Sequence, residues 1–170
     1  MKLIDSKLRF CVVTTTPLVI TFFLKKHLIG LSEIFDLALA YNKDLDNYIE
    51  PLDIPATIFP IDIQRKISLI KDLKALFQLF AVFRAQRTEI VWAVAPKAGL
   101  LAMVAAYFAR VPIRVFIFQG EVWATKKGVS RWILKFADQI TAFLSTDLLA
   151  VSPSERDFLE ENKITSIGKI

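Results

Sequence analysis

The sequence has very few of the residues that cross-link small domains or bind metals. Its 170 residues include one cysteine (Cys11), one histidine (His27) and five glycines. A single cysteine excludes a disulfide framework. One cysteine and one histidine are also too few to form a Cys/His set for structural zinc. With 54% hydrophobic residues, the chain has enough apolar surface to exclude a disordered protein. We therefore expect a reducing-compartment protein with a large apolar core.

Long uninterrupted hydrophobic runs are also missing, although the mean hydropathy is high at +0.45. The apolar stretch over residues 10–24 contains the run Thr14–Thr16 followed by Pro17, and the stretch over residues 90–109 is broken by Pro96 and Lys97. A helix that spans a bilayer needs about 20 consecutive apolar residues. We expect no transmembrane helix, while peripheral contact with a membrane stays open.

Charge is distributed unevenly along the chain. Residues 31–64 hold seven acidic side chains against one lysine, a net charge of −6, whereas residues 65–135 hold thirteen basic against three acidic side chains, a net charge of +10. Such a basic region indicates an anionic partner, which could be a phosphorylated substrate, an anionic lipid or a nucleic acid. A solvated basic face explains the same pattern equally well.

Short apolar segments alternate with helical patterns along the whole chain. We predict strands over residues 8–14, 35–41, 56–61, 89–94, 111–118 and 148–151, and helices over residues 18–31, 69–83, 97–110 and 129–144, with a further helix capped by Ser152. This alternation favours the α/β class, a Rossmann-like open parallel sheet of about six strands with helices on both faces. Residues 166–170 look like the onset of another strand. We therefore expect residues 1–170 to be a single domain that forms the first half of something longer.

Two of the predicted helices carry a regular apolar stripe. One stripe comprises Leu69, Leu73, Leu76, Phe77, Phe80 and Phe83, and the other comprises Val129, Trp132, Ile133, Phe136, Ala137, Ile140, Phe143 and Leu144. Residues with this spacing share one face of a helix, and such faces normally cover a sheet.

Candidate ligand contacts lie in the loops that follow the predicted strands, because open parallel sheets bind ligands beyond the carboxyl ends of their strands. Lys97 opens a helix at such a strand end, where an ammonium beside free backbone amides favours an anion. The first turn lacks glycine, and no G-x-x-x-x-G-K-[ST] segment occurs, so dinucleotide and P-loop sites are not expected. A surface lysine is the alternative interpretation of Lys97.

A second candidate loop follows the strand predicted over residues 111–118. There Trp123 could stack on a sugar ring while Glu121 accepts hydrogen bonds from its hydroxyls. A tryptophan folded onto the core is an equally good interpretation. His27 is expected at the surface and Cys11 inside a strand, so no Ser/His/Asp triad can be assembled.

Taken together, residues 65–157 resemble the N-terminal domain of family 4 glycosyltransferases, the two-Rossmann-domain (GT-B) enzymes of bacterial surface-polysaccharide synthesis. With Thr14–Pro17 at the start, the resemblance covers nearly the whole chain. Each motif is modest, but the ordered set is fairly specific. The segments that carry it are 65–68 (RKIS), Asp72, Leu73 and Leu76, then 95–101 (APKAGLL), 119–128 (QGEVWATKKG) and 149–154 (LAVSPS).

The resemblance implies a retaining glycosyltransferase that moves a sugar from a nucleotide-sugar to a saccharide acceptor, which can be lipid-linked, in capsule, exopolysaccharide or O-antigen synthesis. It implies no metal and no cofactor. In that family the second domain binds most of the donor, and its Arg/Lys pair and glutamates neutralise the leaving diphosphate. These residues would lie beyond Ile170. We therefore expect this half to be inactive alone. Relatives often carry histidines on the fourth strand, where this chain has Trp92 and Val94.

The resemblance also suggests roles for individual residues, none of them a general base. The substrate-binding candidates are Thr15 and Thr16 as hydrogen-bonding groups, Arg65 and Lys97 as cationic contacts to phosphate, Gly120 for close backbone approach, and Glu121 and Trp123 as sugar contacts. Its setting would be cytoplasmic, at the inner face of the cell membrane, with salt-sensitive contact through Lys66, Lys71, Lys74, Arg84, Arg87, Lys126, Lys127, Arg131 and Lys135.

Two other classes of function fit parts of the sequence. A non-catalytic peripheral membrane or partner-binding α/β domain would use the basic face and the exposed aromatics. Nucleic-acid binding is the weaker alternative and is not expected, because the basic residues fit it but no recognised motif does.

Overall fold

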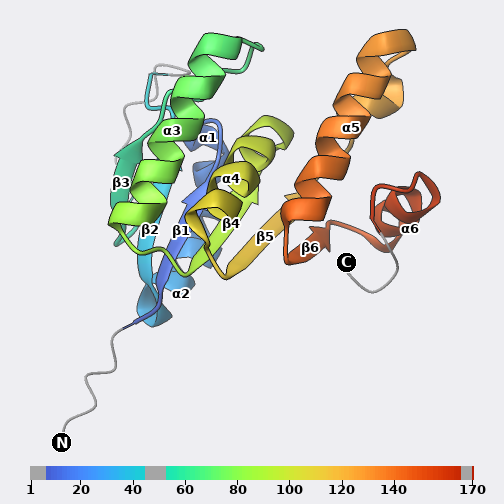
Figure 1. The fold of residues 1–170 in the computed structure, drawn as a ribbon. Coiled ribbons are helices and arrows are strands. Elements are labelled where there is room, and N and C mark those ends of the chain that lie inside the picture. The colour runs from blue at the N-terminus through green and yellow to red at the C-terminus, as the bar shows by residue number, and fades with distance from the viewer. Residues whose placement is uncertain (1–6, 45–52, 166–169) are drawn as a thin grey trace, which may run out of the picture.

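The computed structural model describes residues 7–44, 53–165 and 170. Its strands form one parallel sheet in the order β3-β2-β1-β4-β5-β6 (Figure 1). The strands are β1 (Arg9–Val13), β2 (Asp36–Tyr41), β3 (Thr57–Pro60), β4 (Ile90–Val94), β5 (Ile113–Phe118) and β6 (Asp147–Ala150). The predicted α/β class with an open parallel sheet of six strands is confirmed.

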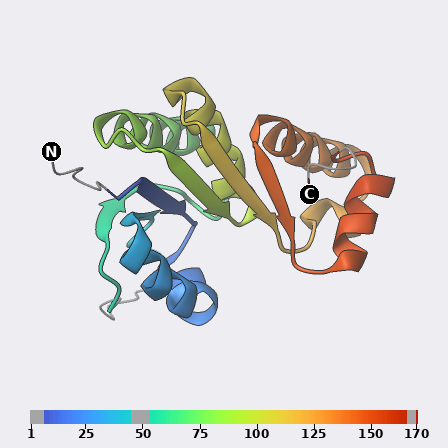
Figure 2. The same ribbon diagram turned by 90° about the horizontal axis from the view of Figure 1, so that it is seen from below.

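Helices cover both faces of this sheet. One face carries α1 (Pro17–Val19), the π-helical turn η1 (Ile20–Leu24) and α2 (Lys25–Ile34). The other carries α3 (Leu69–Ala85), α4 (Pro96–Ala109) and α5 (Gly128–Leu144), as the view along the sheet shows (Figure 2). The short 3₁₀ turn η3 (Val122–Thr125) precedes α5, and α6 (Pro153–Glu161) follows β6. The helix predicted over residues 18–31 is confirmed, with a π-turn inside it that the apolar pattern did not reveal.

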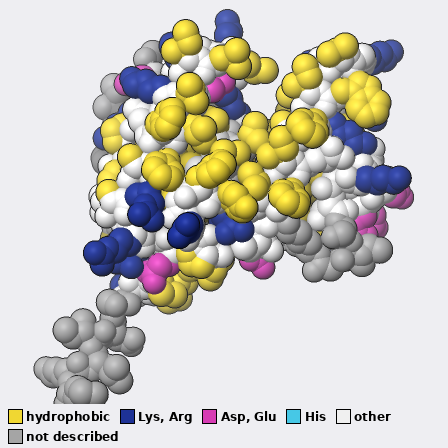
Figure 3. Space-filling view, viewed as in Figure 1, with side chains coloured by type: hydrophobic (Ala, Val, Ile, Leu, Met, Phe, Trp, Pro, Cys, Tyr) yellow, Lys and Arg dark blue, Asp and Glu magenta, His cyan; other side chains and the backbone are white. Residues whose placement is uncertain are grey.

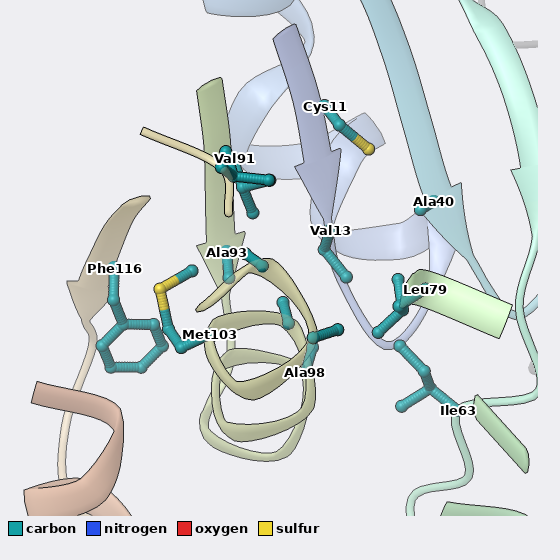
Figure 4. Close-up of a cluster of buried hydrophobic side chains, with 14 of the residues drawn as sticks. Cys11, Val13, Ala40, Ile63, Leu79, Val91, Ala93, Ala98, Met103 and Phe116 are labelled. Atoms are coloured by element: carbon teal, nitrogen blue, oxygen red, sulfur yellow. The ribbon is translucent and has the colours of Figure 1, made fainter. Parts of the chain in front are cut away.

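The core follows from the alternation of side chains along the strands. Val91 and Ala93 of β4 belong to the cluster beneath α3 and α4, whereas Trp92 and Val94 pack with the cluster beneath α1 and α2. Figure 4 shows the first cluster, with Met103 of α4 lying beside Phe116 of β5. Because α4 is rich in alanine, it can lie close to the sheet, and most of its small side chains are fully buried.

The apolar stripe predicted for α5 faces away from the sheet. Trp132 is 73% exposed, Phe136 61% and Phe143 79%, while Asp138, Thr141 and Ala142 of the same helix are buried. The sequence pattern identified an amphipathic helix correctly, but the expectation that its apolar face covers the sheet was wrong. The small inward side chains let α5 approach its neighbours, and the buried Asp138 carboxylate bonds to a tryptophan beneath the helix.

The two apolar stretches considered as membrane spans form ordinary elements of the domain. Residues 10–24 form most of β1, the turn after it and the first helical segments, and residues 90–109 form β4 and α4. Within the described part of the chain, no helix is long and apolar enough to cross a bilayer. The strand onset predicted at residues 166–170 lies outside the described residues, apart from Ile170.

Candidate substrate-binding edge

The candidate site lies where the order of the strands reverses, between β1 and β4. The turn Thr14–Thr16 follows β1, and Ala95 follows β4, so the two connections leave neighbouring strand ends in opposite directions. Such a switch point opens a crevice at the carboxyl edge of a parallel sheet.

Thr15 and Thr16, in the turn after β1, are nearly buried, at 8% and 4% exposure. Thr15 also accepts a hydrogen bond through its carbonyl from the backbone N–H of Asn42 at 3.3 Å, which ties this turn to the end of β2.

Ala95 adopts a backbone conformation that is rare for a residue with a side chain. Its φ of +80° and ψ of 140° differ from those of Arg110, which ends α4 in the ordinary left-handed region at φ +61°. Strained conformations of this kind cost on the order of 1–3 kcal/mol and cluster at functional sites. Sequence reasoning missed Ala95, because an alanine carries no signal for a positive φ.

Lys97, in the first turn of α4, is held by two groups of the α3 region. Its Nζ lies 2.6 Å from Asp72 Oδ1 and donates a hydrogen bond to the Lys66 carbonyl at 2.6 Å. The other Asp72 oxygen accepts a hydrogen bond from the Ser68 N–H at 3.1 Å. Lys97 therefore braces α3 against α4, and it remains 20% exposed. The contact with Lys66 also places the neighbouring Arg65, which is exposed, beside the start of α4.

The loop after β5 is fixed at Gly120 by a carboxylate from α6. The backbone N–H of Gly120 donates to Glu155 Oε1 at 2.5 Å, and the N–H of Val151 donates to Glu155 Oε2 at 2.8 Å. The Glu155 N–H in turn donates to the Ser152 side chain at 3.1 Å, so the predicted cap by Ser152 is confirmed. Gly120 has φ +94°, and nothing lies within 4 Å of the position that a Cβ would take. The loop therefore presents open backbone at this edge.

Glu121 is the carboxylate of this edge that is best placed to accept a new donor. Its Oε1 is buried and has no hydrogen-bond partner among the described residues. Burial raises the pKa of Glu121, and the nearby negative charges of Glu155 and Asp138 raise it further, against the opposing effect of its own backbone N–H. A hydroxyl of a bound sugar would satisfy this oxygen, because an unpartnered buried acceptor is costly.

Trp123 lies beneath the loop rather than at its surface. Its side chain is fully buried, its Nε1–H donates to Asp138 Oδ2 at 2.8 Å, and its ring stacks on Phe158 at 5.4 Å between centroids. The Arg131 guanidinium and the Lys135 ammonium lie 5.5 Å and 5.1 Å from the ring centroid. In this conformation the indole offers no face to a sugar, and it supports the 120–125 loop from below.

These groups can bind a polar, phosphorylated ligand, but they do not form a nucleophile–base pair. Three adjacent strand ends supply hydroxyl groups (β1), a partly exposed ammonium (β4), and open backbone with a carboxylate (β5). Across residues 7–44, 53–165 and 170, no three His, Cys, Asp or Glu side chains gather as metal ligands. His27 is exposed and Cys11 is buried in β1, as their sequence positions predicted.

Two known glycosyltransferases are similar to the chain in sequence. Over 114 residues the chain is 34% identical to the capsular polysaccharide biosynthesis glycosyltransferase CapM of Staphylococcus aureus, a match that covers 64% of this chain and 30% of the relative. Over 129 residues it is 28% identical to an Escherichia coli enzyme named UDP-Gal:alpha-D-GlcNAc-diphosphoundecaprenol alpha-1,3-galactosyltransferase, covering 74% of this chain and 33% of that enzyme. The chain thus spans about a third of the length of these relatives.

A solved structure shares the fold at much lower identity. A putative UDP-N-acetylglucosamine 2-epimerase from Listeria monocytogenes superposes with a TM-score of 0.69 at 18% identity, over 93% of this chain and 43% of that one. The sequence pattern of the family described as "Glycosyl transferase 4-like domain" matches residues 35–166, which is well over half of the chain. The chain therefore belongs to the glycosyl transferase 4-like domain family.

Proposed function

We propose that this chain is the acceptor-side half of a retaining glycosyltransferase of surface-polysaccharide synthesis. The full enzyme would transfer a sugar from a nucleotide-sugar to a lipid-linked saccharide acceptor. Membership of the family supports this proposal, and so does the name of the E. coli relative, which specifies a UDP-sugar donor and a diphosphoundecaprenol-linked acceptor. The observation that carries it is the juxtaposition of the ends of β1, β4 and β5 at the point where the strand order reverses.

The proposed roles follow from where each group lies. Thr15 and Thr16 would hydrogen-bond the substrate from the β1 turn, and Gly120 would let a ligand approach the backbone. Glu121 would accept a sugar hydroxyl through its unpartnered oxygen. Arg65 and Lys97 would offer positive charge to a phosphate, Lys97 through the fraction of its ammonium that Asp72 leaves accessible.

Trp123 takes a supporting role in this proposal. Because the indole is buried, the direct sugar contact expected from the sequence would need a rearrangement of the loop, and we assign that contact to Glu121 alone. No residue of the chain is assigned as a general base. The leaving diphosphate would be stabilised electrostatically by groups of a second domain, as in other enzymes that place charge where it develops in the transition state.

The proposed setting is the inner face of the cell membrane, because a lipid-linked acceptor is presented there. The chain would contact this anionic surface peripherally, through the basic residues of α3, α5 and the loop before α5. A soluble acceptor would remove the need for such contact, so the transferase proposal and the membrane proposal can be tested separately.

A binding experiment on the chain itself tests the acceptor assignment. We expect a short-chain polyprenyl-diphosphate sugar to shift the amide NMR signals of Thr15, Lys97, Gly120 and Glu121. The amide signals of residues at the opposite, amino-terminal ends of the strands should not shift. The chain alone should transfer no sugar from any nucleotide-sugar. Absence of binding would favour a non-catalytic partner-binding domain, and sugar transfer by the isolated chain would refute the division into two halves.

A further inference from the structure

Helix α5 is inverted relative to an ordinary helix on the surface of a soluble protein. Its single carboxylate, Asp138, is only 6% exposed, and Thr141 is fully buried. Its apolar residues Trp132, Phe136 and Phe143 project from the opposite side into solvent at 61–79% exposure. Monomeric soluble proteins rarely expose large contiguous apolar patches, and such patches mark interaction sites.

The first half of α3 repeats this arrangement on the same side of the sheet. Leu69, Ile70 and Phe77 are 83%, 85% and 64% exposed. The only acidic residue of α3 is Asp72, and it turns toward Lys97. Figure 3 shows hydrophobic side chains gathered across this helix-bearing side of the molecule, with basic side chains between and around them. We call this surface the α3–α5 face, and its residues are Leu69, Ile70, Leu73, Phe77, Val129, Trp132, Ile133, Phe136 and Phe143.

Basic side chains outnumber acidic ones around the α3–α5 face, where Lys74 is ion-paired with Asp62 of the loop before α3 at 2.6 Å. Positive side chains are contributed by α3, by its flanking loops and by the segment that leads into α5, namely Lys66, Lys71, Lys74, Arg84, Arg87, Lys126, Lys127 and Arg131. The carboxylates of both helices, Asp72 and Asp138, point inward. A second copy of this chain seated face to face would bring these cations together, which disfavours self-association through this surface. A bilayer of anionic lipids complements both the positive charge and the exposed apolar side chains of this face.

We propose that the α3–α5 face docks on an anionic bilayer by inserting its apolar side chains into the headgroup region. This inference rests on the membrane contact proposed above and specifies how that contact is made. Amphipathic helices with Trp and Phe on one side and Lys or Arg beside them lie in the membrane interface, where buried apolar area adds to electrostatic attraction. Docking is then only partly sensitive to salt, unlike contact through surface lysines alone.

Vesicle binding by the full 170-residue chain tests the proposal. We expect co-sedimentation with phosphatidylglycerol/phosphatidylcholine vesicles that is weakened but retained at 1 M NaCl, where the Debye length is about 3 Å. The exchange of Trp132 and Phe136 for serine should reduce binding tenfold or more, because burial of each side chain contributes substantially to partitioning. The matched control is the exchange of Phe22 and Phe23 for serine, since these phenylalanines are 71% and 69% exposed on the other side of the sheet.

Tryptophan fluorescence supplies a second reading of the same docking. Trp123 is buried, and Trp92 packs with the cluster beneath α1 and α2 on the other side of the sheet. The exposed Trp132 should therefore account for a blue shift on vesicle binding, and Trp132→Phe should remove that shift while keeping most of the binding.

Binding that 1 M NaCl abolishes, and that serine at positions 132 and 136 leaves unchanged, would overturn insertion but leave electrostatic contact standing. Equal losses in the Phe22/Phe23 control would overturn the assignment to this face. Failure to bind vesicles at any salt concentration would overturn both membrane proposals. Dimerisation that depends on Trp132 would assign the face to a second copy. None of these results would decide the sugar-transfer proposal, which has its own test.

Discussion

The indole N–H of Trp123 donates a hydrogen bond to the buried carboxylate of Asp138 across 2.8 Å. This contact joins the loop after β5 to the inner side of α5. It gives the inner side of α5 a polar anchor beneath the loop, opposite the exposed apolar stripe of the helix. One hydrogen bond therefore links the loop that carries Gly120 and Glu121 to the helix whose outer side is proposed to meet the membrane.

Replacing Asp138 should change how stability depends on pH. Burial raises the pKa of Asp138 from 3.8 to about 6, and the indole N–H opposes that rise. The folded state therefore holds a proton more tightly than the unfolded state between these values, so the free energy of unfolding falls as pH rises from 4 to 6, by about 3 kcal/mol for this group. Asp138→Asn keeps an acceptor for the indole, and urea unfolding at pH 4 and pH 8 should show this fall largely removed.

The exposed Asp53 provides the control for this measurement, because Asp53→Asn should retain the wild-type fall in stability. Identical pH dependence in the wild type and Asp138→Asn would show that Asp138 does not titrate in this range.

Glu155 should control the order of the Gly120 loop. Its carboxylate accepts hydrogen bonds from the amides of Gly120 and Val151, at the ends of two neighbouring strands. Glu155→Ala should speed hydrogen exchange at both amides by about tenfold, a modest effect for charge-assisted bonds at an exposed position. Glu155→Gln, which keeps one acceptor oxygen, should have an intermediate effect. Glu161→Ala in the last turn of α6 is the control, and unchanged protection in Glu155→Ala would remove the proposed positioning role.

Any side chain at position 99 should destabilise the fold. Gly99 lies in α4 against β5, and a Cβ at this position would overlap the ring of Phe116. Gly99→Ala should lower the free energy of unfolding by about 1–3 kcal/mol, because the packed ring cannot move away freely. Gly30→Ala in α2 is the matched control, since nothing lies within 4 Å of its added Cβ. It should be neutral or stabilise by up to about 1 kcal/mol. Equal urea midpoints for both variants would contradict the close packing of α4.

Lys97 has two candidate roles, in bracing α3 and in binding substrate, and the single variants Lys97→Ala and Asp72→Asn separate them. In the polypeptide that carries transferase activity, Lys97→Ala should lower kcat/KM about ten- to a hundredfold if its ammonium contacts phosphate. Asp72→Asn removes the brace while keeping the cation, so it should lower stability more than activity. If Lys97→Ala and Asp72→Asn lose stability equally and both retain wild-type kcat/KM, Lys97 is only a brace.

The sequence determined the order and class of the elements. Continuous apolar strand segments alternating with helical patterns were enough to predict a parallel sheet, because strands that are covered on both faces are apolar throughout. The same reasoning placed Ser152 at a helix start and Gly120 in a strand-end loop. The motif set around Lys97 and Gly120 was enough to indicate the family.

The tertiary structure alone decided which way those elements face and what their polar groups bind. The amphipathicity of α5 is readable from residues 129–144, but its orientation depends on Trp123 and Asp138, which the chain brings together only on folding. The positive φ of Ala95 and the reach of Glu155 to Gly120 are likewise invisible in the sequence. A local pattern fixes which side chains share a face, whereas contacts between distant segments determine whether that face meets the core or the solvent.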